Sequence, residues 1–368
     1  MKVGITSFVL SENTYYSNGI ALNVKLWYHF LQEKCGFDVS ILTNDKIDNI
    51  DNPENYKYIY FMDLWDSSGK IIPNYKQEKP ELFDFDVVFL IGLCDTIYFS
   101  YLHKHNIKLI YVMLGSNYHN DISDLIRDNK FASIYYEKFD EIWISPHFQY
   151  CQEYYKIRYK TDNVFISPYF WRNDFLIKDN IIENVLTDIN ELKVAVFEPN
   201  IEQAKFFLIP LSICEKAHND ITKLKIFNST KFNKNTFFNK LIVGTNLHKT
   251  NKLCVEGRHS LGYILTTYCN CVVSYVEDCD LNYVFLECFY LGVPLIHNSI
   301  MLKDYGYYYP RLNVTRGAEQ IKNVIKNHNR QQYINKHKPL LDKYSINNPL
   351  YATWVKEKLK KNINCDCI

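Results

Sequence analysis

Long apolar runs are missing from the 368-residue sequence. No stretch approaches the about 18 residues that a membrane-spanning helix needs, so we expect no transmembrane segment. The apolar stretch at residues 3–10 is too short, and too soon followed by Ser-Glu-Asn, for a signal peptide. We therefore expect a cytoplasmic protein.

A basic excess is missing too, because 42 Lys and Arg face 41 Asp and Glu, which leaves a formal charge of +1. General nucleic-acid binders show such an excess or a basic stripe, so we expect no nucleic-acid partner. Any anion that binds must be held locally, by a few groups.

CxxC pairs are missing among the 11 cysteines. Cys269 and Cys271 alternate, as do Cys365 and Cys367, but neither pair has a partner pair at the spacing of a zinc site. We expect reduced, buried cysteines and no metal site.

Short apolar runs that alternate with helical spacing are what the sequence does contain. Such alternation predicts an α/β protein with parallel sheets covered on both faces. The expected strands are residues 3–8, 39–42, 58–61, 87–91, 109–114, 142–145, 164–168, 194–198, 225–227, 253–255, 272–275 and 294–297.

The length exceeds what one core usually supports, so we expect two domains. An N-terminal Rossmann-like domain spans residues 1–175 and a C-terminal one spans 180–344, and a helix within 345–368 packs back onto the first. Two such sheets facing across a cleft bind ligands at the carboxyl ends of their strands.

Residues 272–299 carry the strongest functional signal, because they predict a strand, a loop, a helix, a glycine stop and a strand. Asp280 or Asn282 can cap the helix, and Gly292 can end it. Tyr283 and Glu287 lie four apart and share a face. The helix start offers N–H groups to a phosphate, and Glu287 can accept hydrogen bonds from a ribose diol. The alternative is a solvated helix glutamate.

The segment Glu198-Pro199-Asn200 follows the first strand of the second domain. We expect a helix to start there, with Lys205 in its early turns as a point charge for a diphosphate. The alternative for Lys205 is a solvated surface lysine.

The stretch LECFYLGVPLI at 286–296 resembles the helix of retaining glycosyltransferases of the GT-B superfamily that carry two acids separated by seven residues. The resemblance implies that Glu287 is the second acid. The first acid falls on Cys279, which Asp278 and Asp280 flank. The superfamily also places an Arg and a Lys five apart on the phosphates. Asn200 and Lys205 have that spacing, and Arg258 is the candidate for the missing cation.

A family of bacterial and giant-virus glycosyltransferases is still more similar. The shared stretches are EPNIEQAKFFLIP from 198, EGR from 256, LNYVFLECFYLGVPLIHNS from 281 and YGYYYP from 305. This resemblance implies that His297 and Asn298 line the donor site. By analogy it implies an acceptor in viral surface glycans and a location in the host cytoplasm.

Two loops of the N-terminal half complete the predicted site. Asn18 and Gly19 precede a helix where GT-B enzymes carry a glycine-bearing loop near the donor phosphates. His119 and Asp121 follow an apolar strand, and either can act as base towards an acceptor hydroxyl. The alternative is a helix cap by Asp121 beside an exposed His119.

We therefore predict sugar transfer from a nucleotide sugar, a UDP-sugar by superfamily frequency, to a glycan hydroxyl without a metal or other cofactor. His119, Asp121 and Asp280 are the catalytic candidates. The sequence Asp278-Cys279-Asp280 leaves a metal site open. Open alternatives are a non-catalytic nucleotide- or glycan-binding protein and a nucleotide-sugar epimerase.

Overall fold

The computed structural model describes residues 1–10, 19–47, 55–92, 95–115, 117–127, 138–178, 180–201 and 204–360. The chain forms two compact units. Unit 1 comprises Met1–Phe170 with Tyr344–Ile368, and unit 2 comprises Trp171–Lys343.

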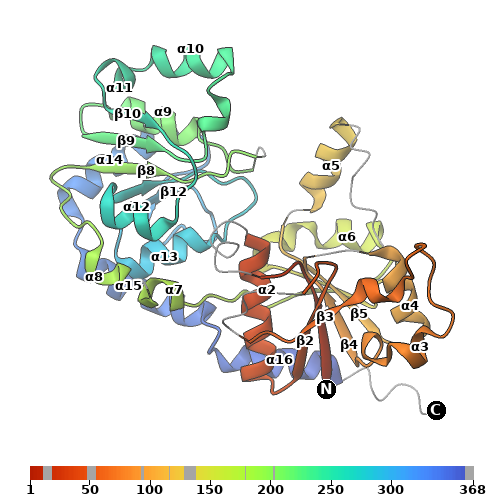
Figure 1. Ribbon diagram of the computed structural model, residues 1–368. Coiled ribbons are helices and arrows are strands. Elements are labelled where there is room, and N and C mark those ends of the chain that lie inside the picture. Colours follow the sequence, from red (N-terminus) through yellow and green to blue (C-terminus); the bar gives the residue numbers. More distant parts are fainter. Residues whose placement is uncertain are drawn as a thin grey trace. The chain divides into compact units, whose positions relative to one another are not determined.

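Unit 1 contains a seven-stranded parallel sheet in the order β3-β2-β1-β4-β5-β6-β7 (Figure 1). Its strands are β1 (Lys2–Thr6), β2 (Asp38–Thr43), β3 (Tyr58–Tyr60), β4 (Val87–Leu90), β5 (Lys108–Met113), β6 (Glu141–Ile144) and β7 (Val164–Ile166). The central strand β4 is buried throughout, which explains its continuous apolar sequence.

Helices connect these strands and cover the sheet of unit 1. They are α2 (Gly19–His29) with the π-turn η1 (Phe30–Lys34), η2 (Phe61–Leu64), α3 (Tyr75–Glu78), η3 (Pro80–Leu82), α4 (Thr96–Lys104), α5 (Asn117–Arg127), η4 (Pro146–Cys151), α6 (Gln152–Arg158) and α16 (Pro349–Lys360).

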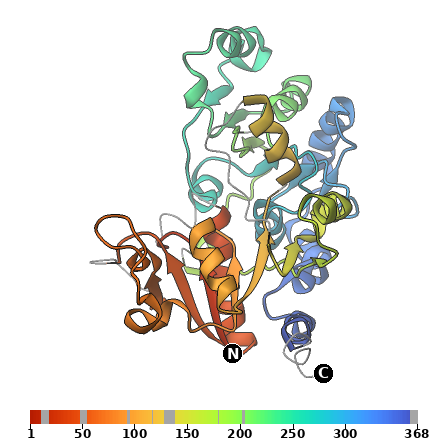
Figure 2. The same cartoon turned by 90° about the vertical axis from the view of Figure 1, so that its right-hand side faces the viewer.

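The last helix, α16, packs beside α2 against the sheet of unit 1 (Figures 1 and 2). Its Trp354 meets Trp143 of β6 at 4.8 Å between ring centroids, and Tyr351 meets Phe170 at 5.6 Å. Such aromatic pairs add to the apolar burial, so the end of the chain supplies part of the unit 1 core.

Unit 2 contains a six-stranded parallel sheet in the order β10-β9-β8-β11-β12-β13. Its strands are β8 (Lys193–Val196), β9 (Lys223–Ile226), β10 (Leu253–Val255), β11 (Cys271–Val273), β12 (Leu295–His297) and β13 (Tyr307–Tyr308). In chain order this is 3-2-1-4-5-6, the order of a Rossmann sheet. The two-residue strand β13 was not predicted, because so short a segment shows no periodicity.

The helices of unit 2 enclose a core built on Val194, Val196, Ile213, Ile296 and Ile321. They are α7 (Asp174–Lys178), α8 (Ile181–Asn184), α9 (Leu208–Lys216), η5 (Thr230–Phe232), α10 (Thr236–Gly244), α11 (Asn246–Lys249), α12 (Leu261–Thr267), α13 (Tyr283–Leu291), α14 (Val314–Asn327) and α15 (Arg330–Tyr344).

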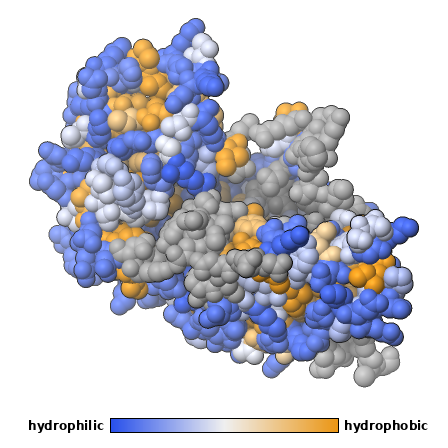
Figure 3. Space-filling model, viewed as in Figure 1, coloured by the Kyte–Doolittle hydropathy of each residue, from blue (hydrophilic) through white to orange (hydrophobic). Residues whose placement is uncertain are grey.

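The surface is mostly hydrophilic in the view of Figure 3, with apolar residues gathered near the end of unit 2 that carries α10. That helix exposes Phe237 and Val243. No helix of the described part of the chain is both long and apolar enough to cross a membrane.

Two buried histidines hold the loop between β12 and β13, His297 from the end of β12 and His337 from α15. His297 Nε2–H donates to the Tyr305 carbonyl at 2.9 Å, and its Nδ1 accepts from the Ser299 N–H at 3.2 Å. His337 Nε2 accepts the Gly306 N–H at 2.8 Å, and its ring stacks on Phe289 at 4.2 Å. Burial lowers the pKa of both to about 4, so both are neutral at neutral pH.

We expect His297 and His337 to stabilise the fold less at pH 5 than at pH 7. The unfolded chain protonates these histidines near their ordinary pKa of 6.5, whereas the folded chain resists protonation down to about 4. The unfolded state then binds more protons, which costs about 2 kcal/mol of stability per histidine at pH 5.

The buried carboxyls of Glu198 and Glu287 change stability in the opposite direction over this range, so the histidine contribution is measured by urea unfolding of the wild type and a histidine variant at both pH values. The variant His337→Phe keeps the ring against Phe289 but cannot be protonated, so lowering the pH from 7 to 5 should change its stability more favourably than that of the wild type, by about 2 kcal/mol. An equal change in both proteins would contradict the role of His337.

Candidate functional site

The carboxyl edge of the unit 2 sheet is the candidate site. In the order β10-β9-β8-β11-β12-β13, the chain reverses its winding direction between β8 and β11. The loops after these two strands therefore leave towards opposite faces of the sheet, and ligands of open α/β sheets bind at such a switch point.

Helix α13 follows the loop after β11 and points its start towards this edge. The Asn282 side chain caps it by accepting the Val284 N–H at 3.2 Å, so Asn282 rather than Asp280 is the cap. Gly292 ends it with a φ of 71°, and a Cβ there would lie 2.6 Å from Arg330. Only glycine combines this backbone conformation with so close a neighbour.

Most of α13 is buried, and only one stripe is partly exposed. Phe285, Leu286, Cys288, Phe289 and Leu291 form the buried part. The stripe contains Tyr283, Val284, Glu287 and Tyr290. Its spacing of three to four residues places these side chains on one face of the helix.

Glu287 lies in the middle of that stripe. Its carboxylate is half-buried and has no hydrogen-bond or ion-pair partner within the described ranges. Burial raises its pKa from 4.5 to about 7. Removing a carboxylate from water without giving it a hydrogen-bond partner lowers the stability of the fold. Groups of this kind cluster at functional sites.

Glu198 is a second buried carboxylate at the switch point, and we did not predict it as a site residue. It follows β8, and its Oε1 accepts from the Ser274 hydroxyl at 2.6 Å and from the Tyr275 N–H at 2.9 Å. Burial raises its pKa to about 7, although the Lys205 charge acts in the opposite direction. The sequence feature that could have identified Glu198 is its place directly after an apolar strand, where a charged side chain is rarely exposed to solvent.

Lys205 lies in the loop before α9, so the prediction that it sits within a helix was wrong. Pro210 explains the late start, because proline is tolerated in the first turn but clashes inside a helix. The loop is held instead by Asn200, which accepts the Phe207 N–H on Oδ1 at 2.9 Å and donates Nδ2–H to the Phe227 carbonyl. Both polar atoms of the Asn200 amide are therefore used within the protein.

Further cations follow the neighbouring strands. Arg258 is exposed after β10, and Lys231 donates to the Pro199 carbonyl at 3.0 Å after β9. Burial and the nearby Arg258 lower the pKa of Lys231, as expected for two like charges in proximity. Arg311 follows β13 with a φ of 38°, which is rare for a side chain of this size. Neither Lys231 nor Arg311 was predicted, since lone basic residues in loops carry no pattern.

The remaining predicted residues of unit 2 hold loops together. Asp280 Oδ1 accepts the Ile300 N–H at 2.6 Å. The Asn298 amide accepts the Val276 N–H at 2.8 Å and donates to the Val276 carbonyl at 2.6 Å. His297 is the buried neutral histidine described above. These side chains fix the shape of the carboxyl edge.

The predicted residues of unit 1 lie in a different part of the chain from these. His119 and Asp121 belong to α5, and Asp121 accepts from the Tyr154 hydroxyl at 2.5 Å and pairs with Arg158 at 3.7 Å. Gly19 begins α2. Asn18 lies outside the described residues.

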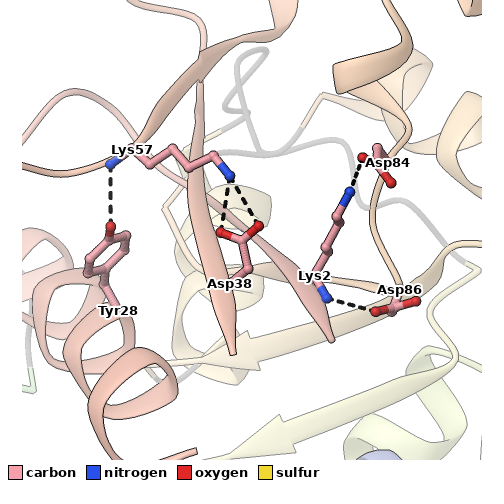
Figure 4. Close-up of polar contacts among 6 residues, drawn as sticks. All are labelled: Lys2, Tyr28, Asp38, Lys57, Asp84 and Asp86. Atoms are coloured by element: carbon pink, nitrogen blue, oxygen red, sulfur yellow. Dashed lines mark hydrogen bonds and ion pairs between the residues drawn. The ribbon is translucent and has the colours of Figure 1, made fainter. Parts of the chain in front are cut away.

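A small cavity of about 90 Å³ lies at the opposite, amino edge of the unit 1 sheet. Figure 4 shows its charges paired with one another: Lys57 with Asp38 at 3.0 Å, and the Lys2 side chain with Asp84. The Lys2 backbone N–H also donates to Asp86 at 2.7 Å. Both lysines of the cavity are therefore engaged by carboxylates of the protein.

The chain belongs to the family described as "Protein of unknown function (DUF2827)", whose model matches residues 3–359. No curated protein matches the chain in sequence.

Several glycosyltransferases of known structure are similar in fold. The pneumococcal O-GlcNAc transferase GtfA, solved with UDP and GlcNAc, has a TM-score of 0.59 at 9% identity over 99% of each chain. The lipopolysaccharide outer core galactosyltransferase WaaB has 0.57 at 12%, over 97% of this chain and 100% of that one. The UDP-forming trehalose-phosphate synthase of Burkholderia xenovorans has 0.59 at 8%, over 98% and 99%. The predicted fold class, two Rossmann-like parallel sheets of the GT-B type, is confirmed.

Because burial raises the pKa of Glu287, this group should make the protein less stable as the pH rises. The folded state keeps its proton up to about pH 7, whereas an unfolded glutamate loses it near 4.5. Stability therefore falls between these values and stays lower above pH 7, by at most about 3 kcal/mol.

The variant Glu287→Gln removes this charge. In urea unfolding it should exceed the wild type in stability at pH 8 and match it at pH 4.5. A glutamine variant that is less stable than the wild type at pH 8 would show that the carboxylate is satisfied in the fold.

Proposed function

We propose that this protein is a glycosyltransferase that moves a sugar from a nucleoside diphosphate sugar to an acceptor hydroxyl. The donor binds at the carboxyl edge of the unit 2 sheet, across the switch point between β8 and β11.

The half-buried carboxylate of Glu287, which has no hydrogen-bond or ion-pair partner among the described residues, is the observation that carries this proposal. It lies one turn beyond the capped start of α13, on the partly exposed stripe with Tyr283. A carboxylate in that position can accept both hydroxyls of a ribose, and the two hydrogen bonds offset its desolvation. The free N–H groups and positive dipole of the helix start favour a phosphate beside it.

The diphosphate would be neutralised by protein cations, and no metal is needed in this scheme. Lys205 supplies one positive charge on the loop after β8, and Arg258 and Lys231 follow β10 and β9. These groups stabilise the charge that develops on the leaving diphosphate when the bond to the sugar breaks. Fixed donors of this kind need no reorganisation during the reaction.

A UDP-sugar is the donor that the fold relatives support, since GtfA was solved with UDP and the trehalose-phosphate synthase is UDP-forming. The motif resemblance supports a glycan hydroxyl as the acceptor, and by analogy the acceptor belongs to the surface glycans of a virus. The enzyme would then act in the cytoplasm of the host cell. His119 is the remaining candidate for the base, because the carboxylate of Asp121 is already engaged by Tyr154 and Arg158.

Binding without transfer is the second candidate function. Cys279 stands where retaining relatives are expected to carry their first acid, and the neighbouring Asp280 accepts the Ile300 N–H. A protein with this loop can keep the ribose and phosphate contacts and lack the group that acts on the sugar.

UDP and UDP-sugars should raise the melting temperature of the purified protein. A ligand at about 100 times its Kd stabilises the folded state by roughly 2.7 kcal/mol. Glu287→Ala should abolish the shift, and Lys205→Ala should weaken UDP binding about tenfold, the loss of one charge-assisted contact.

Matched controls are Glu319→Ala and Lys216→Ala, which remove exposed charges of α14 and α9 in the same unit. Both should bind UDP like the wild type. Release of free sugar from a bound UDP-sugar separates the transferase from the binding protein. A wild-type melting temperature unchanged by every UDP- and GDP-sugar would exclude the donor site.

A further inference from the structure

The loops on the two sides of the unit 2 switch point are joined by direct hydrogen bonds. Glu198 follows β8 and accepts from Ser274 and Tyr275 after β11 at 2.6 and 2.9 Å. Farther along the same loops, the Glu277 N–H donates to the Ala204 carbonyl at 2.8 Å. The segment that leads to α13 is therefore tied to the segment that carries Lys205.

The other side of this segment is fixed as well. Asn298 binds both backbone groups of Val276. The Tyr309 hydroxyl donates to the Ser274 carbonyl at 2.8 Å. The strands β12 and β13 hold one side of this segment, and Asn200 and Lys231 hold the Lys205 loop towards β9. The contacts of Glu198 and Ala204 join the two.

Both bonds to Glu198 end on the same oxygen, Oε1. The side chain is only 2% exposed, so it is not available as a contact for a ligand of ordinary size. An amide oxygen in the same place could accept both bonds, whereas a side chain shorter by one methylene could not reach them.

We propose that Glu198 is a positioning residue that sets the distance between Lys205 and Glu287, and thereby the register of the pyrophosphate and ribose contacts of the donor. This inference rests on the proposed function. Its mechanism is geometric: without the Oε1 bridge, the Lys205 loop and α13 still form, but one ligand can no longer engage both at once.

The test compares UDP with uridine, which lacks the phosphates. Isothermal titration gives the Kd of each ligand. The Kd of uridine divided by the Kd of UDP measures how much the phosphates add to binding, and therefore how well one ligand reaches both the phosphate contacts and the ribose contact. In Glu198→Ala this ratio should fall about tenfold, with uridine affected little. A role limited to stability would lower the melting temperature and leave the ratio unchanged.

Two conservative variants separate the effect of the length of the Glu198 side chain from the effect of its negative charge. Glu198→Gln keeps the acceptor oxygen and should retain the wild-type ratio, while Glu198→Asp keeps the charge and should lose it. Ser274→Ala removes one of the two bonds and should give an intermediate ratio, and with the Asp variant it provides the test if Glu198→Ala does not fold.

Two results would overturn the inference. If the ratio in Glu198→Ala and Glu198→Asp equals that of the wild type while Glu287→Ala still abolishes UDP binding, the positioning role is wrong and the donor site stands. If the wild type itself binds no UDP, the proposed function and the inference both fail.

Discussion

The Glu198 carboxylate accepts two hydrogen bonds across the switch point of unit 2, and these bonds join the loops that follow β8 and β11. The reversal of winding between β8 and β11 sends their loops apart, which creates room for a ligand beyond the paired ends of the two strands. A buried acid restores a connection there. Its cost is a desolvated carboxyl group, offset by the two donors and by the charge of Lys205.

Glu287 presents the opposite case within the same unit. Its carboxylate is also partly dry, yet no donor within the described residues satisfies it. Folding is opposed by this group at neutral pH, which is expected where stability is given up for binding. Burial raises the pKa of both Glu198 and Glu287 to about 7, so the pKa does not tell their roles apart. Their hydrogen bonds do, because Glu198 accepts two within the protein and Glu287 accepts none from the described residues.

Several polar residues of the motifs act on the protein itself. The side chains of Asn200, Asn298 and His297 form hydrogen bonds with the backbone of neighbouring loops. A motif rich in such residues therefore marks a precisely shaped loop as much as a set of ligand contacts. The pattern agrees with a site in which a few groups bind and many position.

The sequence by itself determined the α/β class, nearly all of the strands and the glycine end of α13, and it narrowed the helix cap to Asp280 or Asn282. Apolar periodicity and capping act over a few residues, which is why the sequence shows them. It also singled out Glu287, since an acid in an apolar helix is conspicuous. The start of α9, the strand β13, the bridge at Glu198 and the engagement of Asp121 were decided only by the tertiary structure. Each depends on partners distant in the chain, such as Ser274 for Glu198 and Tyr154 for Asp121, or on a turn whose hydrogen bonds outweigh local helix propensity.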